Sequence, residues 1–424
     1  MNAGFYFQET SSDALMQTLE IRALVSDPIQ SIWYLHVNPP LFDIIRLLLI
    51  IPDYLLGNDI TDMLVDRRLY LFYALLFSCM GVLVYRTLRL LDCSQLGSIV
   101  IVLVWSIYPG NISMATYLDP TYLSAFLLMF ATYQGMVWMR SRRTRNAYWT
   151  LIALLLLSWT RSLFQVQFLL PIILIAIYRF IRKRECSPKS IVRLALVLML
   201  AALPLKQFAL FGTYSTSSFV GAHQLGLIQY EPTDEELSAV RVPDRLIRNA
   251  SKVESKYNSL ANATLNFQQE SVFRDRLRDA PLSSISQIPS TVLKVGRNAL
   301  SATQEYQPNQ ASEQLPWASL SRWLFSGWRY LAFAVIGLAG LAARGRFGDS
   351  RVRVLLLATA AVGIQILMGA LRSRSGVFQW VEANRLKFII EPMIFCLFGA
   401  GAMALNRSFV KTTLWRLRGA RGGN

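Results

Sequence analysis

The sequence is poor in charged residues. Only 16% of its 424 residues are Asp, Glu, Lys or Arg, whereas average soluble domains carry about a quarter. Hydrophobic residues make up 53% of the chain, and the mean hydropathy is positive, at +0.35. This composition excludes a disordered chain, a coiled coil and an ordinary soluble enzyme, and it predicts an integral membrane protein.

Cysteine and histidine are also scarce. The four cysteines are Cys79, Cys93, Cys186 and Cys396, and none lies in the long polar stretch 213–322. Their spacing matches neither a disulfide framework nor a CxxC metal site. The chain has two histidines, too few for a site built on histidine ligands. We therefore expect no metal and no cofactor.

Nine apolar runs are long enough, alone or with flanking residues, to cross a membrane, which takes about 20 residues of helix. They fall at about 69–91, 96–110, 118–139, 146–160, 163–181, 190–212, 323–343, 352–371 and 386–405. The expected fold class is an all-α polytopic membrane protein with about nine transmembrane helices. Interfacial helices on the outer leaflet and a large outer loop complete it.

Basic residues follow every second run, as the positive-inside rule requires. The clusters are Arg86 and Arg89; Arg140, Arg142, Arg143 and Arg145; Arg179, Arg182, Lys183, Arg184, Lys189 and Arg193; Arg344, Arg346, Arg351 and Arg353; and Arg407, Lys411, Arg416, Arg418 and Arg421. They hold about half of the 43 Lys and Arg residues. The net charge of +17 is thus explained by topology, and no nucleic-acid partner is needed.

This orientation divides the chain into four parts. We expect an outer-side N-terminal segment with interfacial helices (1–68) and a six-helix transmembrane module (69–212). An extracytoplasmic loop or cap (213–322) follows. Three transmembrane helices and a basic cytoplasmic tail (323–424) end the chain.

Segment 40–57 is apolar enough to lie in the membrane. As a full span it would break the alternation of the other nine, and Asp43 and Arg46 lie within its first two turns. We interpret it as an interfacial helix on the outer leaflet; a full span is the alternative.

An outer N-terminus must be carried across the membrane. The first 15 residues lack the basic start and the apolar core of a signal peptide. Either the first span draws the tail across, or a helix precedes Met1, which is the account we favour.

Polar residues gather on the expected outer side. Asp13, with Glu9 one turn earlier, opens a helical pattern that runs on to Leu24. His36 and Asn38 precede a Pro-Pro pair, which favours a clean helix start. The alternatives are an Asp13 that only stabilises a helix start and a His36 with an ordinary interfacial hydrogen bond.

Further candidates lie between later spans. Tyr117 and Asp119 precede the third span, and Arg161 ends the fourth. The alternative for Asp119 is a helix cap, and for Arg161 it is extension to lipid headgroups.

Before the last span come Arg385 and Lys387, and then Glu391 inside the apolar run. Arg385, Lys387 or Arg161 could neutralise this glutamate. Arginine binds phosphate with two parallel hydrogen bonds, and a carboxylate can take a proton from an acceptor hydroxyl. This set of residues suits glycosyl transfer from a polyprenyl-phosphate sugar.

In their order and membrane side, these segments resemble the polytopic C-type glycosyltransferases that use polyprenyl-phosphate sugars, the protein O-mannosyltransferase and lipid A aminoarabinose transferase group. The resemblance covers most of the chain, although each motif is short. The matching pieces are the acidic start at Asp13, His36-x-Asn38-Pro39-Pro40-Leu41, Tyr117-Leu-Asp119-Pro120, Thr160-Arg161, the segment 212–221, and Asn384-Arg385-x-Lys387-Phe388-x-x-Glu391-Pro392.

The resemblance implies a general base, a donor site and an inverting single displacement without a nucleotide sugar. The base would be Asp13 or Glu9. The donor phosphate would be held by Arg161, Arg385 and Lys387, and the substrates by His36, Asn38, Tyr117, Asp119 and Glu391. The acceptor would be a glycan, a lipid or a protein. The site would face the extracytoplasmic side of a bacterial inner membrane.

The chain departs from the family pattern in two ways. We expect the family's first helix to have no counterpart within the sequence, and Asp13 stands with Glu9 rather than in an adjacent acidic pair. Three alternatives stay open: a lipid-linked glycan flippase or transporter, an oligosaccharide polymerase or ligase, and an inactive member of the family. A transporter fits less well, since we find no internal repeat and few polar residues within the spans.

Overall fold

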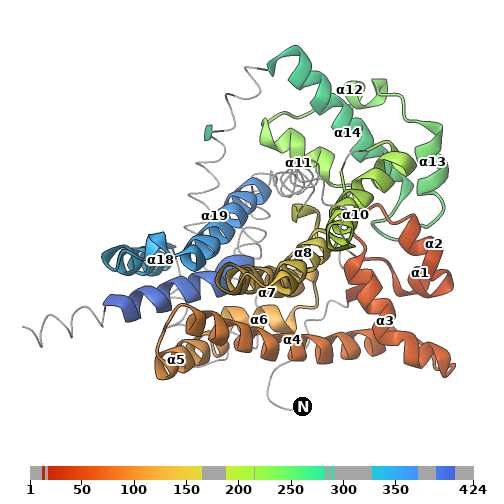
Figure 1. The fold of residues 1–424 in the computed structure, drawn as a ribbon. Coiled ribbons are helices and arrows are strands. Elements are labelled where there is room, and N and C mark those ends of the chain that lie inside the picture. The colour runs from red at the N-terminus through yellow and green to blue at the C-terminus, as the bar shows by residue number, and fades with distance from the viewer. Residues whose placement is uncertain are drawn as a thin grey trace, which may run out of the picture.

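The computed structural model describes residues 12–14, 18–164, 188–213, 215–281, 286, 289–290, 327–370 and 388–405. Throughout these ranges every regular element is a helix, and no strand occurs among them. The expected all-α class is confirmed for this part of the chain (Figure 1).

The helices fall into four groups along the chain. The N-terminal group is η1 (Ser12–Ala14), α1 (Ile21–Ser26), α2 (Pro28–Trp33) and α3 (Leu41–Leu55). The second is α4 (Asp62–Leu90), α5 (Gln95–Ser106), α6 (Pro109–Thr116), α7 (Pro120–Ser141), α8 (Thr144–Ser158), η2 (Ser162–Phe164) and α10 (Pro188–Phe211). The third is α11 (Val220–Leu227), α12 (Asp234–Ala239), α13 (Asp244–Ala250) and α14 (Leu260–Asp279). The last is α18 (Gly327–Ala343), η3 (Arg346–Gly348), α19 (Ser350–Ala370) and a C-terminal helix (Phe388–Leu405) whose first turn is η4 (Phe388–Ile390).

Side-chain caps set the starts of the long helices. The hydroxyl of Thr61 accepts a hydrogen bond from the amide of Leu64 at the start of α4. Ser94 does the same for Gly97 at the start of α5. Such caps satisfy amides that have no partner within the helix. At its other end α7 stops at Arg142, whose φ of 55° turns the chain out of the helix.

Three described helices are long and apolar enough to cross a membrane: α4, α7 and the C-terminal helix. A fourth crossing results if α5 and the following helix, bent by 64° against each other, form one span. The chain is therefore consistent with an integral membrane protein. Helices occupy eight of the nine expected positions, while 163–181 lies outside the described residues beyond 164. The nine crossings stay a prediction.

Helix α3 confirms that segment 40–57 is helical. Its 15 residues span about 22 Å, less than the roughly 30 Å of a bilayer core. Asp43 and Arg46 are buried on its inner face, whereas Leu48, Tyr54 and Leu55 are more than half exposed. A charged inner face with an apolar outer face suits a helix lying in the membrane interface.

The expectation of a continuous helix from Asp13 to Leu24 is wrong. Ser12–Ala14 forms a single 3₁₀ turn, and Leu19 and Glu20 are not helical. The amide of Leu19 donates to the Asp43 carboxylate at 3.2 Å, and its carbonyl accepts from Arg46 at 2.6 Å. Because α3 takes both backbone groups of Leu19, they are not available to a helix, and α1 begins only at Ile21.

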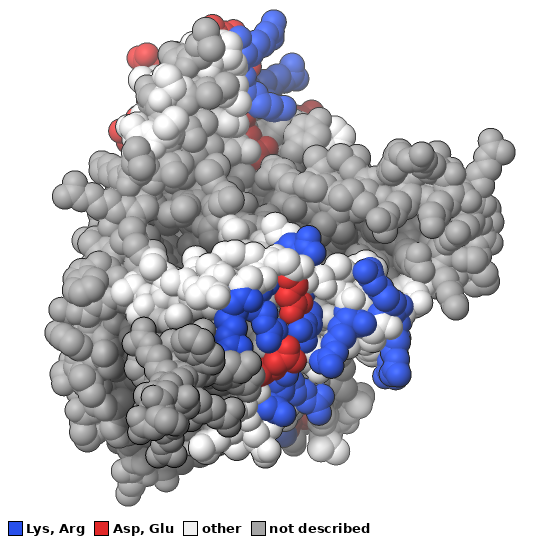
Figure 2. Space-filling model, turned by 60° about the vertical axis from the view of Figure 1, so that its left-hand side comes forward, with Lys and Arg blue, Asp and Glu red and all other residues white. Residues whose placement is uncertain are grey.

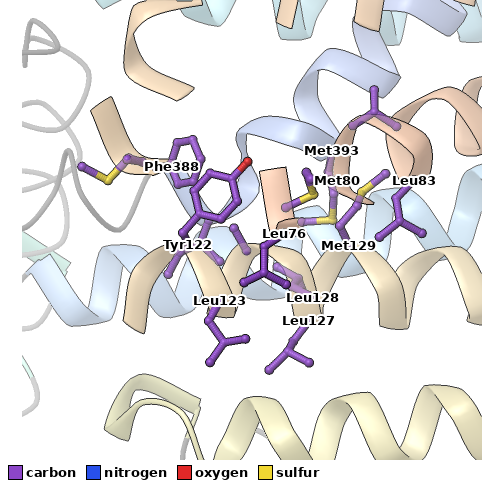
Figure 3. Packing of buried hydrophobic residues seen from close by; sticks show 14 of the residues in the cluster. Leu76, Met80, Leu83, Tyr122, Leu123, Leu127, Leu128, Met129, Phe388 and Met393 are labelled. Atoms are coloured by element: carbon purple, nitrogen blue, oxygen red, sulfur yellow. The ribbon is translucent and has the colours of Figure 1, made fainter. Parts of the chain in front are cut away.

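The apolar core lies where α4, α7 and the C-terminal helix meet (Figure 3). Met80, Met129 and Met393 come from these three helices and are almost completely buried. At one end of the core the rings of Tyr122 and Phe388 stack with centroids 5.5 Å apart. The C-terminal helix is thereby fixed beside the start of α7.

The opposite end of the bundle is basic. Asp92, in the turn between α4 and α5, accepts from Arg346 at 2.8 Å and from Arg351 at 3.1 Å. Asp349 binds Arg351 at 2.6 Å. Figure 2 shows this side of the molecule, where basic side chains border a few acidic ones. We call it the basic end, and the end where α7 begins the Asp119 end.

Helices α11–α14 form a separate polar group, the cap, which lies away from α5 in Figure 1. Its longest helix is α14, which spans 20 residues from Leu260 to Asp279. Gly221 of α11 approaches α14 so closely that a Cβ there would lie 2.6 Å from the carbonyl oxygen of Asn266. Its amide donates to the Asn266 side chain at 2.7 Å.

Close packing of α18 against the C-terminal helix gives a first prediction. A Cβ at Gly401 would lie 2.1 Å from the carbonyl oxygen of Gly337, and small residues let membrane helices approach in this way. We expect Gly401→Ala to lower the free energy of unfolding by about 1–3 kcal/mol, because the helices must separate. Gly348→Ala is the control, since nothing lies within 4 Å of its Cβ position. Equal thermal unfolding of both purified variants in detergent would contradict this packing.

Candidate functional site

Asp119 joins α4 and α7. Its carboxylate caps α7 by accepting from the amide of Thr121 at 2.8 Å, and it also accepts from the Thr121 hydroxyl at 2.7 Å. The hydroxyl of Tyr73, on α4, donates to the main-chain carbonyl of Asp119. The capping role considered for this residue is therefore confirmed, and it coexists with any role in binding.

Arg161 follows α8 and points toward the same place. Its Nη1 donates to the Thr121 hydroxyl at 2.5 Å and lies 3.9 Å from the Asp119 carboxylate. The side chain is only 7% exposed. This inward geometry does not fit extension to lipid headgroups. It places a guanidinium beside the start of α7.

The loop before α3 also lies close to Arg161. The amide of Leu41, the first residue of α3, donates to the carbonyl of Trp159 at 2.8 Å. Trp159 lies two residues before Arg161. The segment that carries His36 and Asn38, both buried, is thereby attached to the end of α8.

The backbone around His36 is held by the cap. The Asn258 side chain accepts from the amides of His36 and Val37 at 2.9 and 3.1 Å. The amide of Ser218 donates to the His36 carbonyl at 2.9 Å, and the Ser217 hydroxyl donates to the Val37 carbonyl at 2.7 Å. The segment 212–221, quoted for the resemblance, thus contacts the His36 segment directly.

The end of α10 holds the same loop. The ammonium group of Lys206 donates to the carbonyls of Ile32 and Leu35 at 3.1 and 2.9 Å. Gln207 also donates to the Leu35 carbonyl, at 3.2 Å. The loop 34–40 therefore has its main chain fixed from three directions: α8, α10 and the cap.

The side chain of His36 contrasts with its well-bonded backbone. It is 3% exposed, and within the described residues neither ring nitrogen has a hydrogen-bond partner. Its ring lies edge-on to Phe211 with centroids 5.2 Å apart. Burial and the nearby charge of Lys206 lower the pKa of His36 to about 3, so the imidazole is neutral and can both donate and accept.

The Phe388–Glu391 segment completes the Asp119 end. Phe388 stacks on Tyr122, three residues after Asp119, and Glu391 is completely buried at the start of the C-terminal helix. Tyr117 is linked to Asp119 through its carbonyl, which accepts from the Asp119 amide at 2.8 Å. Two candidates from the sequence, Arg385 and Lys387, lie outside the described residues.

Asp13 is held by α3. Its Oδ1 accepts from the amide of Ile21 and lies 3.2 Å from Nη2 of Arg46. Burial raises the pKa of the Asp13 carboxyl, while the Ile21 amide and Arg46 oppose that rise. Glu9, the other candidate base, lies outside the described residues.

Sequence reasoning missed that Asp43 and Arg46 lie beside Asp13. Arg46 also donates to Asp43 at 2.8 Å, and both side chains are buried. The sequence used these two residues only as an argument against a full span. Their spacing of three on an otherwise apolar helix was a signal that they share one face.

No arrangement of three or more His, Cys, Asp or Glu side chains in the described ranges could hold a metal ion. No model of a known protein family matches the chain, and a search of curated proteins finds no match either. The site must therefore be interpreted from its own geometry.

The buried imidazole predicts a specific pH dependence of stability. Because the pKa of His36 is about 3 in the folded chain and about 6.5 when unfolded, the unfolded state binds more protons between these values. Stability therefore falls as the pH falls below 6.5. We expect His36 to account for about 2 kcal/mol of the loss between pH 7 and pH 5.

Thermal unfolding of the parent and of His36→Gln at pH 7 and pH 5 measures this contribution of His36 to the loss of stability. The loss on acidification should be smaller in His36→Gln. His223→Gln, which changes the only other histidine, is the matched control. If His36→Gln loses as much stability as the parent, the neutral, buried state of His36 is refuted.

Proposed function

We propose that the chain is a membrane glycosyltransferase that moves a sugar from a polyprenyl-phosphate donor to an acceptor on the extracytoplasmic side. One observation supports this most: four segments far apart in sequence meet at the Asp119 end. They are 34–41, 117–122, 159–164 and 388–391, joined by the Leu41–Trp159, Arg161–Thr121 and Phe388–Tyr122 contacts. These segments carry the residues that resemble the polyprenyl-phosphate-sugar transferases.

The proposal includes nine crossings, with the basic end in the cytoplasm of a bacterial cell and the Asp119 end outside the inner membrane. The ion-paired arginines that follow α18, Arg346 and Arg351, support this orientation, because arginine and lysine concentrate on the cytoplasmic side. In this arrangement the cap lies outside the membrane, over the Asp119 end.

Arg161 is the proposed centre of the donor site. A guanidinium has five N–H donors, and its planar fork matches the oxygens of a phosphate group. Thr121 and Asp119 orient this guanidinium at the start of α7. Arg385 and Lys387 would add positive charge from the segment before the C-terminal helix.

Asp13 is the proposed general base. Its side chain is 20% exposed, whereas that of Asp43 is 1% exposed, so Asp13 is the more accessible carboxylate of the pair. The acceptor hydroxyl gives its proton to Asp13, and its oxygen bonds to the anomeric carbon. The bond from that carbon to the phosphate oxygen breaks, and polyprenyl phosphate leaves with the electron pair. Glu9 is the alternative base.

His36 and Asn38 are the proposed contacts to substrate hydroxyl groups, together with Tyr117, Asp119 and Glu391. A neutral imidazole suits a sugar, since it offers one donor and one acceptor. A buried polar side chain without a partner is costly, and a substrate hydroxyl would provide that partner for His36.

The donor site gives a binding prediction. Arg161→Lys keeps the charge but loses the planar fork. We expect its affinity for a polyprenyl-phosphate sugar to fall by about 10–150-fold, the equivalent of 1.5–3 kcal/mol for a charged hydrogen bond. Arg385→Ala should weaken binding similarly. Arg140→Lys is the control, since Arg140 is exposed and lies in the last turn of α7, at the other end of that helix from Asp119. Equal donor affinity in all four proteins would remove the phosphate assignment.

The base gives a kinetic prediction. In reconstituted vesicles supplied with a labelled polyprenyl-phosphate sugar, Asp13→Asn should bind the donor normally, because the side chain is nearly isosteric. Its turnover should fall by roughly a hundredfold or more. Glu9→Gln is compared in the same assay, and loss of activity there alone would move the base to Glu9. Movement of intact donor across the vesicle without sugar transfer would instead indicate a flippase.

A further inference from the structure

A buried charged cluster lies where the N-terminal segment meets α3. Arg46, completely buried, contacts two carboxylates: Asp43 at 2.8 Å and Asp13 at 3.2 Å. It also donates to the carbonyl of Leu19 at 2.6 Å, while the amide of Leu19 donates to Asp43. Three polar groups from two chain segments thus contact one guanidinium: the carboxylates of Asp13 and Asp43 and the carbonyl of Leu19.

The cluster is unlike an ordinary stabilising contact. Removing charges from water costs several kcal/mol for each ion, and α3 could have placed apolar residues on this inner face, as it does on its outer face. Two carboxylates also face one guanidinium, so full ionisation leaves one negative charge that Arg46 does not balance. That charge favours holding a proton within the cluster.

We propose that Arg46 and Asp43 are positioning residues for Asp13: the guanidinium fixes the Asp13 carboxylate, and Asp43 competes with it for the same positive charge. Together they set the pH at which Asp13 exchanges a proton. Burial raises the pKa of both carboxyl groups. Asp13 is the more distant partner of Arg46, at 3.2 Å against 2.8 Å for Asp43, and its side chain is open to solvent, so Asp13 is the carboxyl that exchanges the proton. The catalytic meaning of this arrangement rests on the proposed function, in which Asp13 is the base.

Other charges around Asp13 belong to the start of α4. Asp66 accepts from the amide of Ser12 at 3.1 Å, and the charge of Asp62 acts in the same direction as burial, raising the pKa of Asp13. Arg46 is the cation that opposes them. The protonation of Asp13 thus depends on the carboxylates of Asp43, Asp62 and Asp66 and on the guanidinium of Arg46. Of these three carboxylates, Asp43 is the one that also contacts Arg46.

Two substitutions should shift the titration of Asp13 in opposite directions. Asp43→Asn removes a negative charge and leaves Arg46 to Asp13 alone, so the carboxylate form gains and Asp13 titrates at lower pH. Arg46→Gln removes the positive charge, so Asp13 titrates at higher pH. Arg46→Lys keeps the charge and should stay closer to the parent. A merely structural role would not produce opposite shifts.

The test is an infrared difference titration of the purified full chain in lipid vesicles, without donor or acceptor. The carboxylic-acid band that appears on acidification and is missing in Asp13→Asn reports Asp13. Its midpoint should move to lower pH in Asp43→Asn and to higher pH in Arg46→Gln. An unchanged or higher midpoint in Asp43→Asn overturns the proposal. That result also decides the matter alone if Arg46→Gln does not fold.

The same variants in the transfer assay separate this inference from the proposed function. The acid limb of the rate against pH should follow the infrared midpoints, moving down for Asp43→Asn and up for Arg46→Gln. Absence of sugar transfer, or full activity of Asp13→Asn, refutes the proposed function while the infrared titration still decides the cluster. Unshifted midpoints in an enzyme that needs Asp13 refute the cluster alone.

Discussion

Three helices of the bundle meet at Asp119. Its side chain caps α7 and accepts from Thr121, its carbonyl accepts from Tyr73 of α4, and Arg161 approaches from the end of α8. Both charged side chains are buried, and a buried charge is stable only when it is paired and hydrogen-bonded; the Thr121 hydroxyl, bonded to both, links them. This requirement fixes the relative heights of the three helices. The stacking of Tyr122 on the C-terminal helix then extends the same register.

The two ends of the bundle use charge differently. At the basic end the ion pairs of Asp92 and Asp349 with arginines are partly exposed, and such pairs contribute little to stability. In the proposed orientation they mark the cytoplasmic side, where arginine accumulates. At the Asp119 end the described charges Asp119 and Arg161 are buried and individually bonded. Polar groups there define geometry, which is what a site for a charged ligand requires.

Much of the fold could be predicted from local patterns. Eight of the nine apolar runs coincide with described helices, and Asp119 was considered as a cap of α7 and is one. Both signals lie within a few residues of the helix that they predict. The break at Leu19 could not be predicted, since it depends on Asp43 and Arg46 more than twenty residues away. The order of the site motifs could be taken directly from the sequence. The contact between Leu41 and Trp159 could not be predicted, because it joins residues more than a hundred positions apart.

Stability alone explains some of the charged residues better than others. Asp119 would be expected at the start of α7 in any protein, because helix starts need an acceptor. Arg46 has no such explanation: a buried guanidinium with two carboxylates is often replaceable by apolar residues without loss of stability. On a helix whose other face is apolar, such a replacement would be simple. Arg46 and Asp43 hold the backbone of Leu19, but that contact does not account for Asp13 as a second carboxylate on Arg46. This second carboxylate is what supports a role for the N-terminal segment in the proposed function.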